Sequence, residues 1–169
     1  AEHAGDMASA MRARLVVADM LQRIGHLATG AQLAMEVQAW ATRHGDQRLT
    51  ARSHLVLSSI FEGIGDASST LEHAVRAIDQ LPSDTTPRER GNFLLRLADA
   101  LAVNRSPDQA RRRYAEARHA FESVGDRERV LGVLNNLTVL ESESGDPAAS
   151  AAAADVLEAE VPADEMNSD

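Results

Sequence analysis

A glycine followed by aspartate recurs along this chain at a fixed interval, and this recurrence limits the possible folds more than any other feature. The dipeptide begins at Gly5, Gly45, Gly65, Gly125 and Gly145, so every interval is a multiple of 20 residues. Gly25 lies on the same lattice, and the points near 85 and 105 carry the turn sequences SDTTP and NRSPD. Glycine supplies the left-handed end of a helix, and the next residue caps the following helix. The lattice therefore predicts about eight helices of roughly 15 residues joined by short turns.

Three of the turns carry a more explicit helix start. TPRE at 86–89 and SPDQ at 106–109 each supply a hydroxyl N-cap, a proline in the first helical position, and Glu or Gln three residues after the cap. GDPA at 145–148 gives Asp146 and Pro147 the first two of these roles. New helices are therefore expected from 87, 107 and 147.

Pairs of helices then repeat every 40 residues. One column of this repeat is small in the first helix (Ala18, Ser58, Ala98, Thr138), and another is small in the second (Gly30, Thr70, Ala110, Ser150). Small side chains let helix backbones approach closely, so these columns predict where paired helices cross. Apolar columns run beside them, such as Val17, Leu57, Leu97 and Leu137, whereas Glu141 interrupts the column Leu21, Phe61, Leu101. A fixed repeat of one helical hairpin is typical of an α-solenoid.

The segments LSSIFEGIGDASSTLEHAVRAI (57–78) and LADALAVNRSPDQARRRYAEAR (97–118) resemble tetratricopeptide repeats. Ala110, Tyr114 and Ala117 match the second-helix pattern of that family. The resemblance covers nearly the whole chain, but the period is 40 rather than about 34, and the usual first-helix Trp is absent. Residues 5–44 fit least well, with Arg14 and Gly30 in the register.

The resemblance implies an all-α fold, a right-handed α-solenoid of about four helical hairpins in a TPR-like superhelix. We expect one repeat domain over residues 5–163, with hairpins at about 5–44, 45–84, 85–124 and 125–163, followed by an acidic tail at 164–169.

The segment AFESVGDRERVLGVLNNLTVLE (120–141) is also similar to the repeat region that precedes the catalytic domains of actinobacterial diguanylate cyclase (GGDEF) proteins. All 17 basic residues are arginine, a bias typical of GC-rich bacterial genomes. The resemblance implies a regulatory or sensory region of a larger bacterial signalling protein.

Composition and charge narrow the classes of partner. There is no cysteine, no apolar run long enough to span a bilayer, and no signal-peptide pattern, so we expect a cytoplasmic protein without a membrane partner. No basic residue follows Arg129, and the whole net charge of −9 lies in the last quarter. With so few aromatics to stack on bases, nucleic acid is not expected as a partner. The run Arg111–Arg113 is interpreted as a solvated helix face, with Glu116 in reach.

No constellation of catalytic or metal-binding residues is present in the sequence. The six histidines form no HExxH or i, i+4 ligand pair, and the known nucleotide-binding and hydrolase motifs are absent. His54 and His73 are expected to face each other within one hairpin, as packed and hydrogen-bonded residues rather than as a metal site. We therefore expect no enzyme activity, no metal and no cofactor in this chain, with any catalytic domain elsewhere in a longer parent chain.

The remaining candidate site is the concave groove that the first helices of tetratricopeptide proteins line. Side chains about half a turn from the core columns point to that side. The candidates are Arg12, Asp19, Arg23, Arg52, Ser59, Glu62, Asn92, Arg96, Asp99, Asn136 and Glu143. The resemblance places Arg96 and Asn136 in the column that holds peptide carboxylate or backbone amide groups, although the lysines of the carboxylate clamp are missing.

These features favour a noncatalytic module that binds a protein or peptide in the concave groove. The alternative is the effector-sensing repeat domain of a bacterial transcription regulator. A second contact is expected at the C-terminal hairpin, whose helix PAASAAAADVLEAE (147–160) has small apolar surface on nearly every side. Either a second copy or the next domain of the parent chain would cover it, and the acidic residues around it disfavour like-with-like docking, which favours the next domain of the parent chain.

Overall fold

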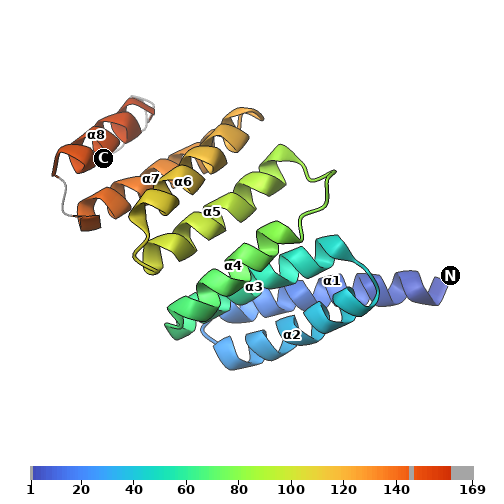
Figure 1. The fold of residues 1–169 in the computed structure, drawn as a ribbon. Helices are drawn as coiled ribbons and strands as arrows, with labels where there is room; N and C mark the ends of the chain where they lie inside the picture. Colours follow the sequence, from blue (N-terminus) through green and yellow to red (C-terminus); the bar gives the residue numbers. More distant parts are fainter. Residues whose placement is uncertain (1, 145–146, 161–169) are drawn as a thin grey trace, which may run out of the picture. The chain divides into compact units, whose positions relative to one another are not determined.

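The computed structural model describes residues 2–144 and 147–160, and these residues form helices and no strands (Figure 1). In chain order they are α1 (Glu2–Arg23), α2 (Leu27–Arg43), α3 (Gln47–Ile64), α4 (Ala67–Asp79), α5 (Pro87–Val103), α6 (Pro107–Glu122), α7 (Arg127–Ser144) and α8 (Pro147–Glu160). The expectation of an all-α chain with about eight helices is therefore confirmed over this part of the chain. The end of the last expected hairpin, 161–163, and the acidic tail at 164–169 lie outside the described residues.

The chain divides into two compact units, Ala1–Thr85 and Thr86–Asp169. In the first unit, α2 contacts both α1 and α3, α4 contacts α3, and α1 also contacts α3. In the second unit, α6 contacts both α5 and α7, α8 contacts α7, and α5 also contacts α7. Each unit is thus an all-helical, repeat-like stack in which every helix lies against the next one in the chain (Figure 1).

The glycine lattice does end helices as expected. Gly25, Gly45, Gly65 and Gly125 all adopt the left-handed conformation, with φ between 66° and 85°. The aspartate that follows then caps the next helix: Asp46 accepts a hydrogen bond from the Leu49 amide at 3.0 Å, and Asp66 accepts one from the Ser69 amide at 3.0 Å. The Ser69 bonds also hold the pKa of the Asp66 carboxyl below its usual value.

Two details of the predicted turns are wrong. Gly5 lies inside α1 rather than at a junction, because the helix formers after it offset the roughly 1 kcal/mol that one helical glycine costs. Ser106 precedes α6 but makes no side-chain cap, since its hydroxyl turns back toward the Asn104 carbonyl at 3.5 Å. At the same turn the left-handed residue is Arg105, with φ of 55°.

The small-residue columns mark close helix contacts, as predicted for the pairs α1–α2 and α3–α4. A Cβ added to Gly30 would lie 3.1 Å from the Ala18 carbonyl oxygen, so α1 and α2 cross almost backbone to backbone. The Ser58 hydroxyl donates to the Thr70 carbonyl at 2.9 Å across the α3–α4 contact. The residues at both helix contacts, Ala18 and Gly30 in one and Ser58 and Thr70 in the other, are buried.

The cores are built largely from alanine and branched aliphatic residues, with a few aromatic rings. In the first unit, buried side chains of α1, α2 and α3 form one cluster that includes Ala34, Val37, Leu57 and Ile60. In the second unit, the fully buried Phe121 ring of α6 lies against Gly91 of α5, where a Cβ would approach the ring to 2.7 Å. Gly91 therefore allows α5 and α6 to pack closely.

Candidate functional site

The groove candidates form one set in each unit. In the first unit Arg12 pairs with Asp46 at 3.7 Å, and Asp19 pairs with Arg23 at 3.2 Å. Arg52 is exposed, and Ser59 and Glu62 are half-buried on α3. The Arg12–Asp46 contact joins α1 to the N-cap of α3. The first-unit candidates therefore lie along the faces of α1 and α3.

The second unit brings candidates from different helices into contact. Asp99 of α5 accepts two hydrogen bonds at Oδ1, from the Asn136 side-chain amide at 3.0 Å and from the Tyr114 hydroxyl at 2.8 Å. Asn136 belongs to α7 and Tyr114 to α6, so one carboxylate joins three helices. Because both donors are neutral and fixed, the position of the Asp99 carboxylate is set before any ligand arrives.

Asn92 and Arg96 extend this arrangement along α5. They stand seven and three residues before Asp99, a spacing that places all three on one face of the helix. Each is half-buried, as is Asn136, so their polar groups lie at a surface without being fully solvated. We call the set Asn92, Arg96, Asp99 and Asn136 the α5–α7 polar face.

The arginine run predicted to be a solvated face divides into different roles. Arg113 pairs with Glu116 at 2.8 Å, as expected. Arg111 instead reaches α7, where its Nε donates to Oε1 of Glu141 at 2.6 Å and its Nη2 donates to Oε2 at 2.7 Å. The interpretation of Arg111 as part of a solvated face was wrong.

The Arg111–Glu141 pair explains why a carboxylate interrupts an apolar column. Glu141 is only 5% exposed, and two parallel bonds from a guanidinium satisfy both of its oxygens. Arg111 also binds Asp108 at 2.7 Å, and the hydrogen bonds that it donates to Glu141 raise the pKa of the Arg111 guanidinium above its already high value. The pair is therefore an inter-helix salt bridge between α6 and α7.

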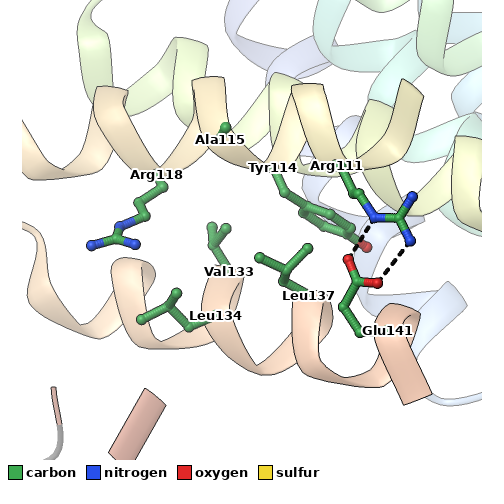
Figure 2. A pocket seen from close by; sticks show the side chains of 8 residues that line it. All are labelled: Arg111, Tyr114, Ala115, Arg118, Val133, Leu134, Leu137 and Glu141. Carbon is green, nitrogen blue, oxygen red and sulfur yellow. Dashed lines mark hydrogen bonds and ion pairs between the residues drawn. The ribbon is translucent and has the colours of Figure 1, made fainter. Parts of the chain in front are cut away.

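A pocket of about 210 Å³ lies between α6 and α7 beside this ion pair (Figure 2). Figure 2 shows the Arg111–Glu141 bonds at one end of the pocket, Arg118 toward the other, and apolar side chains of α7 between them. The lining residues are Arg111, Tyr114, Ala115, Arg118, Val133, Leu134, Leu137 and Glu141. We call this the α6–α7 pocket.

His54 and His73 face each other as predicted, with 2.8 Å between their Nδ1 atoms. One nitrogen must carry the proton and the other must accept it, so at least one of the two rings is neutral. Burial lowers the pKa of His54 to about 4, helped by His73 and Arg76, and burial also lowers the pKa of His73. The His73 ring stacks on Phe61 at 5.2 Å. Among the described residues no third metal-ligating side chain joins them.

Sequence reasoning missed the polar contacts between different helices of the second unit. The Tyr114–Asp99 bond joins residues 15 apart in the sequence, and the Asn136–Asp99 bond joins residues 37 apart. The two residues of the Arg111–Glu141 pair are 30 apart. The only sequence signal for the ion pair was the charge of Glu141 in an otherwise apolar column. A buried carboxylate indicates that Glu141 has a charged partner, but the sequence does not identify that partner as Arg111.

The class of protein that these features define is an all-helical, repeat-like fold, and none of the described helices is both long enough and apolar enough to cross a bilayer. No protein-family model matches the chain, and no curated protein matches it in sequence.

Among solved structures, the chain is similar to BtubC (BKLC) from P. vanneervenii, known from a crystal structure. The TM-score is 0.75 and the sequence identity is 21%, over 90% of this chain and 62% of that protein. The chain therefore spans less than two thirds of the length of that protein. At this identity the likeness establishes the helical repeat-like fold alone.

Proposed function

We propose that this chain is a noncatalytic tetratricopeptide-like module that binds an extended peptide or a protein segment on the α5–α7 polar face. Its helix pairs would form a right-handed solenoid of about four hairpins, in which α5 and α7 are neighbouring first helices. The observation that carries the proposal is the joint anchoring of Asp99 and Asn136, which lie on two first helices and share a hydrogen bond of 3.0 Å.

The chemistry of this face suits a peptide backbone. Amide and carboxylate groups from Asn92, Asp99 and Asn136 can accept from and donate to peptide units, while Arg96 supplies a cation for a carboxylate or a carbonyl. Because Tyr114 and the helices already hold Asp99, little side-chain entropy remains to be lost on binding. A preorganised polar face on rigid helices is therefore the best-supported binding surface.

The α6–α7 pocket supports the effector-sensing alternative less well. Its volume of about 210 Å³ is below the roughly 300–1,000 Å³ of most small-molecule sites. Its two arginines are already engaged, Arg111 by Glu141 and Arg118 by Glu122. We therefore place recognition of a small effector by a transcription regulator second.

The proposed setting is the regulatory or sensory region of a larger bacterial signalling protein, of the kind that precedes diguanylate cyclase domains. The similarity of residues 120–141 to such regions and the exclusive use of arginine support this setting. The output of binding would then pass to a domain elsewhere in the parent chain.

The experiment is a selection of random peptides on the wild-type chain, followed by affinity measurements on two charge-reversal variants. Arg96→Glu on α5 should weaken selected peptides by at least 10-fold, since it reverses the only cation of the α5–α7 polar face. Arg112→Glu, an exposed position on α6, makes the same charge change away from the face and should leave the affinity within about twofold. Equal affinity for wild type and Arg96→Glu would place the binding surface elsewhere.

A further inference from the structure

One face of α1 is exposed, although the equivalent repeat positions in the first helices of other hairpins are buried. Ala10, Ala13, Arg14, Val17 and Met20 all lie on the surface, with Val17 at 47% and Met20 at 59% exposure. We call these five residues the α1 face. Arg12 and Asp19, the groove candidates of the same helix, are not part of it.

The repeat shows what normally covers this face. Forty residues later, in α3, the equivalent positions are buried: Thr50, Ser53, His54, Leu57 and Ile60. In α7 the equivalents Val130, Val133, Leu134 and Leu140 are buried and Leu137 is half-buried. The helix just before covers most of that side in both cases. Leu57 and Ile60 share one buried cluster with α2, and Leu134 and Leu137 line the α6–α7 pocket, whereas His54 bonds His73 of α4. The α1 face therefore matches a surface that, elsewhere in the repeat, packs against the second helix of the preceding hairpin.

The helix α8 offers the matching surface. Ala151 and Ala154 are exposed, whereas their equivalents Ala31 and Ala34 in α2 are buried in the cluster that α2 shares with α1 and α3. Glu158 is likewise exposed one turn further along. We call Ala151, Ala154 and Glu158 the α8 face. It is the surface by which the second helix of one hairpin contacts the first helix of the next hairpin.

We propose that the α8 face of one copy of this chain docks on the α1 face of a second copy. Charge favours this head-to-tail contact over a contact between two C-terminal ends. Residues 125–169 carry the entire net charge of −9, so two α8 faces would repel each other, whereas the first 44 residues are balanced, with four acidic and four basic residues.

The repeat also predicts a specific pair across the contact. In the second unit Leu134 and Arg118 line the same α6–α7 pocket from opposite helices (Figure 2). Their equivalents on the two proposed faces are Arg14 and Glu158, which have opposite charges. Arg14 is free to turn, because its pair with Glu36 in the same chain is 3.6 Å long with both side chains nearly half exposed.

A contact of this kind is heterologous, so each copy keeps one face for the next copy. A single helix face buries less than a standard interface of about 1,600 Å², and we expect a dissociation constant on the order of 100 µM. The assembly should therefore grow with concentration rather than stop at a fixed size at low concentration.

The test is sedimentation equilibrium of the 169-residue chain and its variants from about 10 µM to 1 mM, a range that brackets the expected constant. The wild type should increase in mean mass with concentration. Val17→Asp in α1 and Ala154→Arg in α8 should each remain monomeric, with unchanged helical circular dichroism because both positions are exposed. An equimolar mixture of the two should form dimers and nothing larger, since each variant keeps the face that the other lacks.

Val139→Asp is the matched control, because Val139 is 51% exposed on α7 and belongs to neither face. It should associate like the wild type. Arg14→Glu should weaken association, and adding Glu158→Arg to it should restore association. A strict monomer at 1 mM, or an Ala154→Arg variant that associates like the wild type, would overturn the proposal.

Discussion

At the scale of single residues, Arg105 shows where this chain departs from its own repeat. Four other turns place glycine in the left-handed conformation, whereas here an arginine holds φ at 55°. A residue with a Cβ costs roughly 1–2 kcal/mol in that region relative to glycine. The turn into α6 is therefore the most strained of the described turns that use this geometry.

Arg105→Gly should raise the free energy of unfolding by about 0.5–1 kcal/mol, because relief of the strain exceeds the added entropy of an unfolded glycine. Urea denaturation monitored by circular dichroism measures the change. Arg112→Gly in the exposed middle of α6 is the control and should lower stability by about 1 kcal/mol. A loss of stability in Arg105→Gly would show that the arginine makes a compensating contact.

The His54–His73 pair makes stability depend on pH. An unfolded histidine titrates near 6.5, whereas burial holds the pKa of His54 at about 4 and lowers that of His73. Below about pH 6.5 the unfolded chain therefore binds more protons than the folded one. The pair's contribution is complete above about pH 6.5 and is lost as the pH falls toward about 4.

We expect His54→Leu, which matches Leu94 and Leu134 at the equivalent positions, to flatten the stability curve between pH 6.5 and about 4. Since His73 and its neighbours are partly solvated, the difference from wild type across this range should be about 1–2 kcal/mol, less than the full linkage value. The comparison uses urea denaturation at several pH values. His119→Gln, at an exposed histidine of α6, should keep the wild-type slope, and a slope unchanged in His54→Leu would contradict a neutral pair.

At the scale of helices, the sequence was most informative where one residue decides one turn. Gly25, Gly45, Gly65 and Gly125 were predicted as left-handed because few other residues adopt that conformation easily. Thr86 and Pro87 were predicted at the start of α5, and the Thr86 hydroxyl does accept from the Glu89 amide at 3.2 Å. Such features are local, so the sequence alone contains their cause.

The contacts between helices of the second unit could not be predicted in the same way. Whether Tyr114 reaches Asp99, or Arg111 reaches Glu141, depends on the distance and rotation between helices. These follow from how the core side chains of several helices pack together, and no single position encodes them. The sequence therefore identified Asp99 and Asn136 as candidates but not the bond between them.

Two helical glycines provide a matched test of helix packing in the second unit. Gly91→Ala places a Cβ 2.7 Å from the buried Phe121 ring, so we expect a loss of about 1–3 kcal/mol from overpacking. Gly132→Ala on α7 meets nothing within 4 Å and should instead gain about 0.5–1 kcal/mol through helix propensity. Thermal or urea denaturation separates the two signs. A gain in both variants would mean that α5 and α6 are not packed as described.

At the scale of the whole molecule, the 40-residue repeat gives surfaces that are equivalent in position but not in chemistry. The column Val16, Val56, Arg96 and Asn136 changes from apolar to polar along the chain, and the net charge of −9 gathers in the last quarter. The likeness to BtubC extends over 90% of the chain and concerns the fold alone. The proposed functions therefore rest on particular residues of this chain, namely the α5–α7 polar face and the faces of α1 and α8.

The most direct measurement of the central claim is chemical-shift mapping of the ¹⁵N-labelled chain with a peptide selected on it. Our account predicts that the largest changes occur at the backbone and side-chain amides of Asn92 and Asn136 and at the backbone amides of Arg96 and Asp99. The side-chain amide of Asn136 is the most informative probe, because its bond to Asp99 at 3.0 Å lies at the centre of the proposed face. Changes confined to the α6–α7 pocket or to α1 and α8, with the Asn136 side-chain amide unmoved, would contradict peptide binding on the α5–α7 polar face.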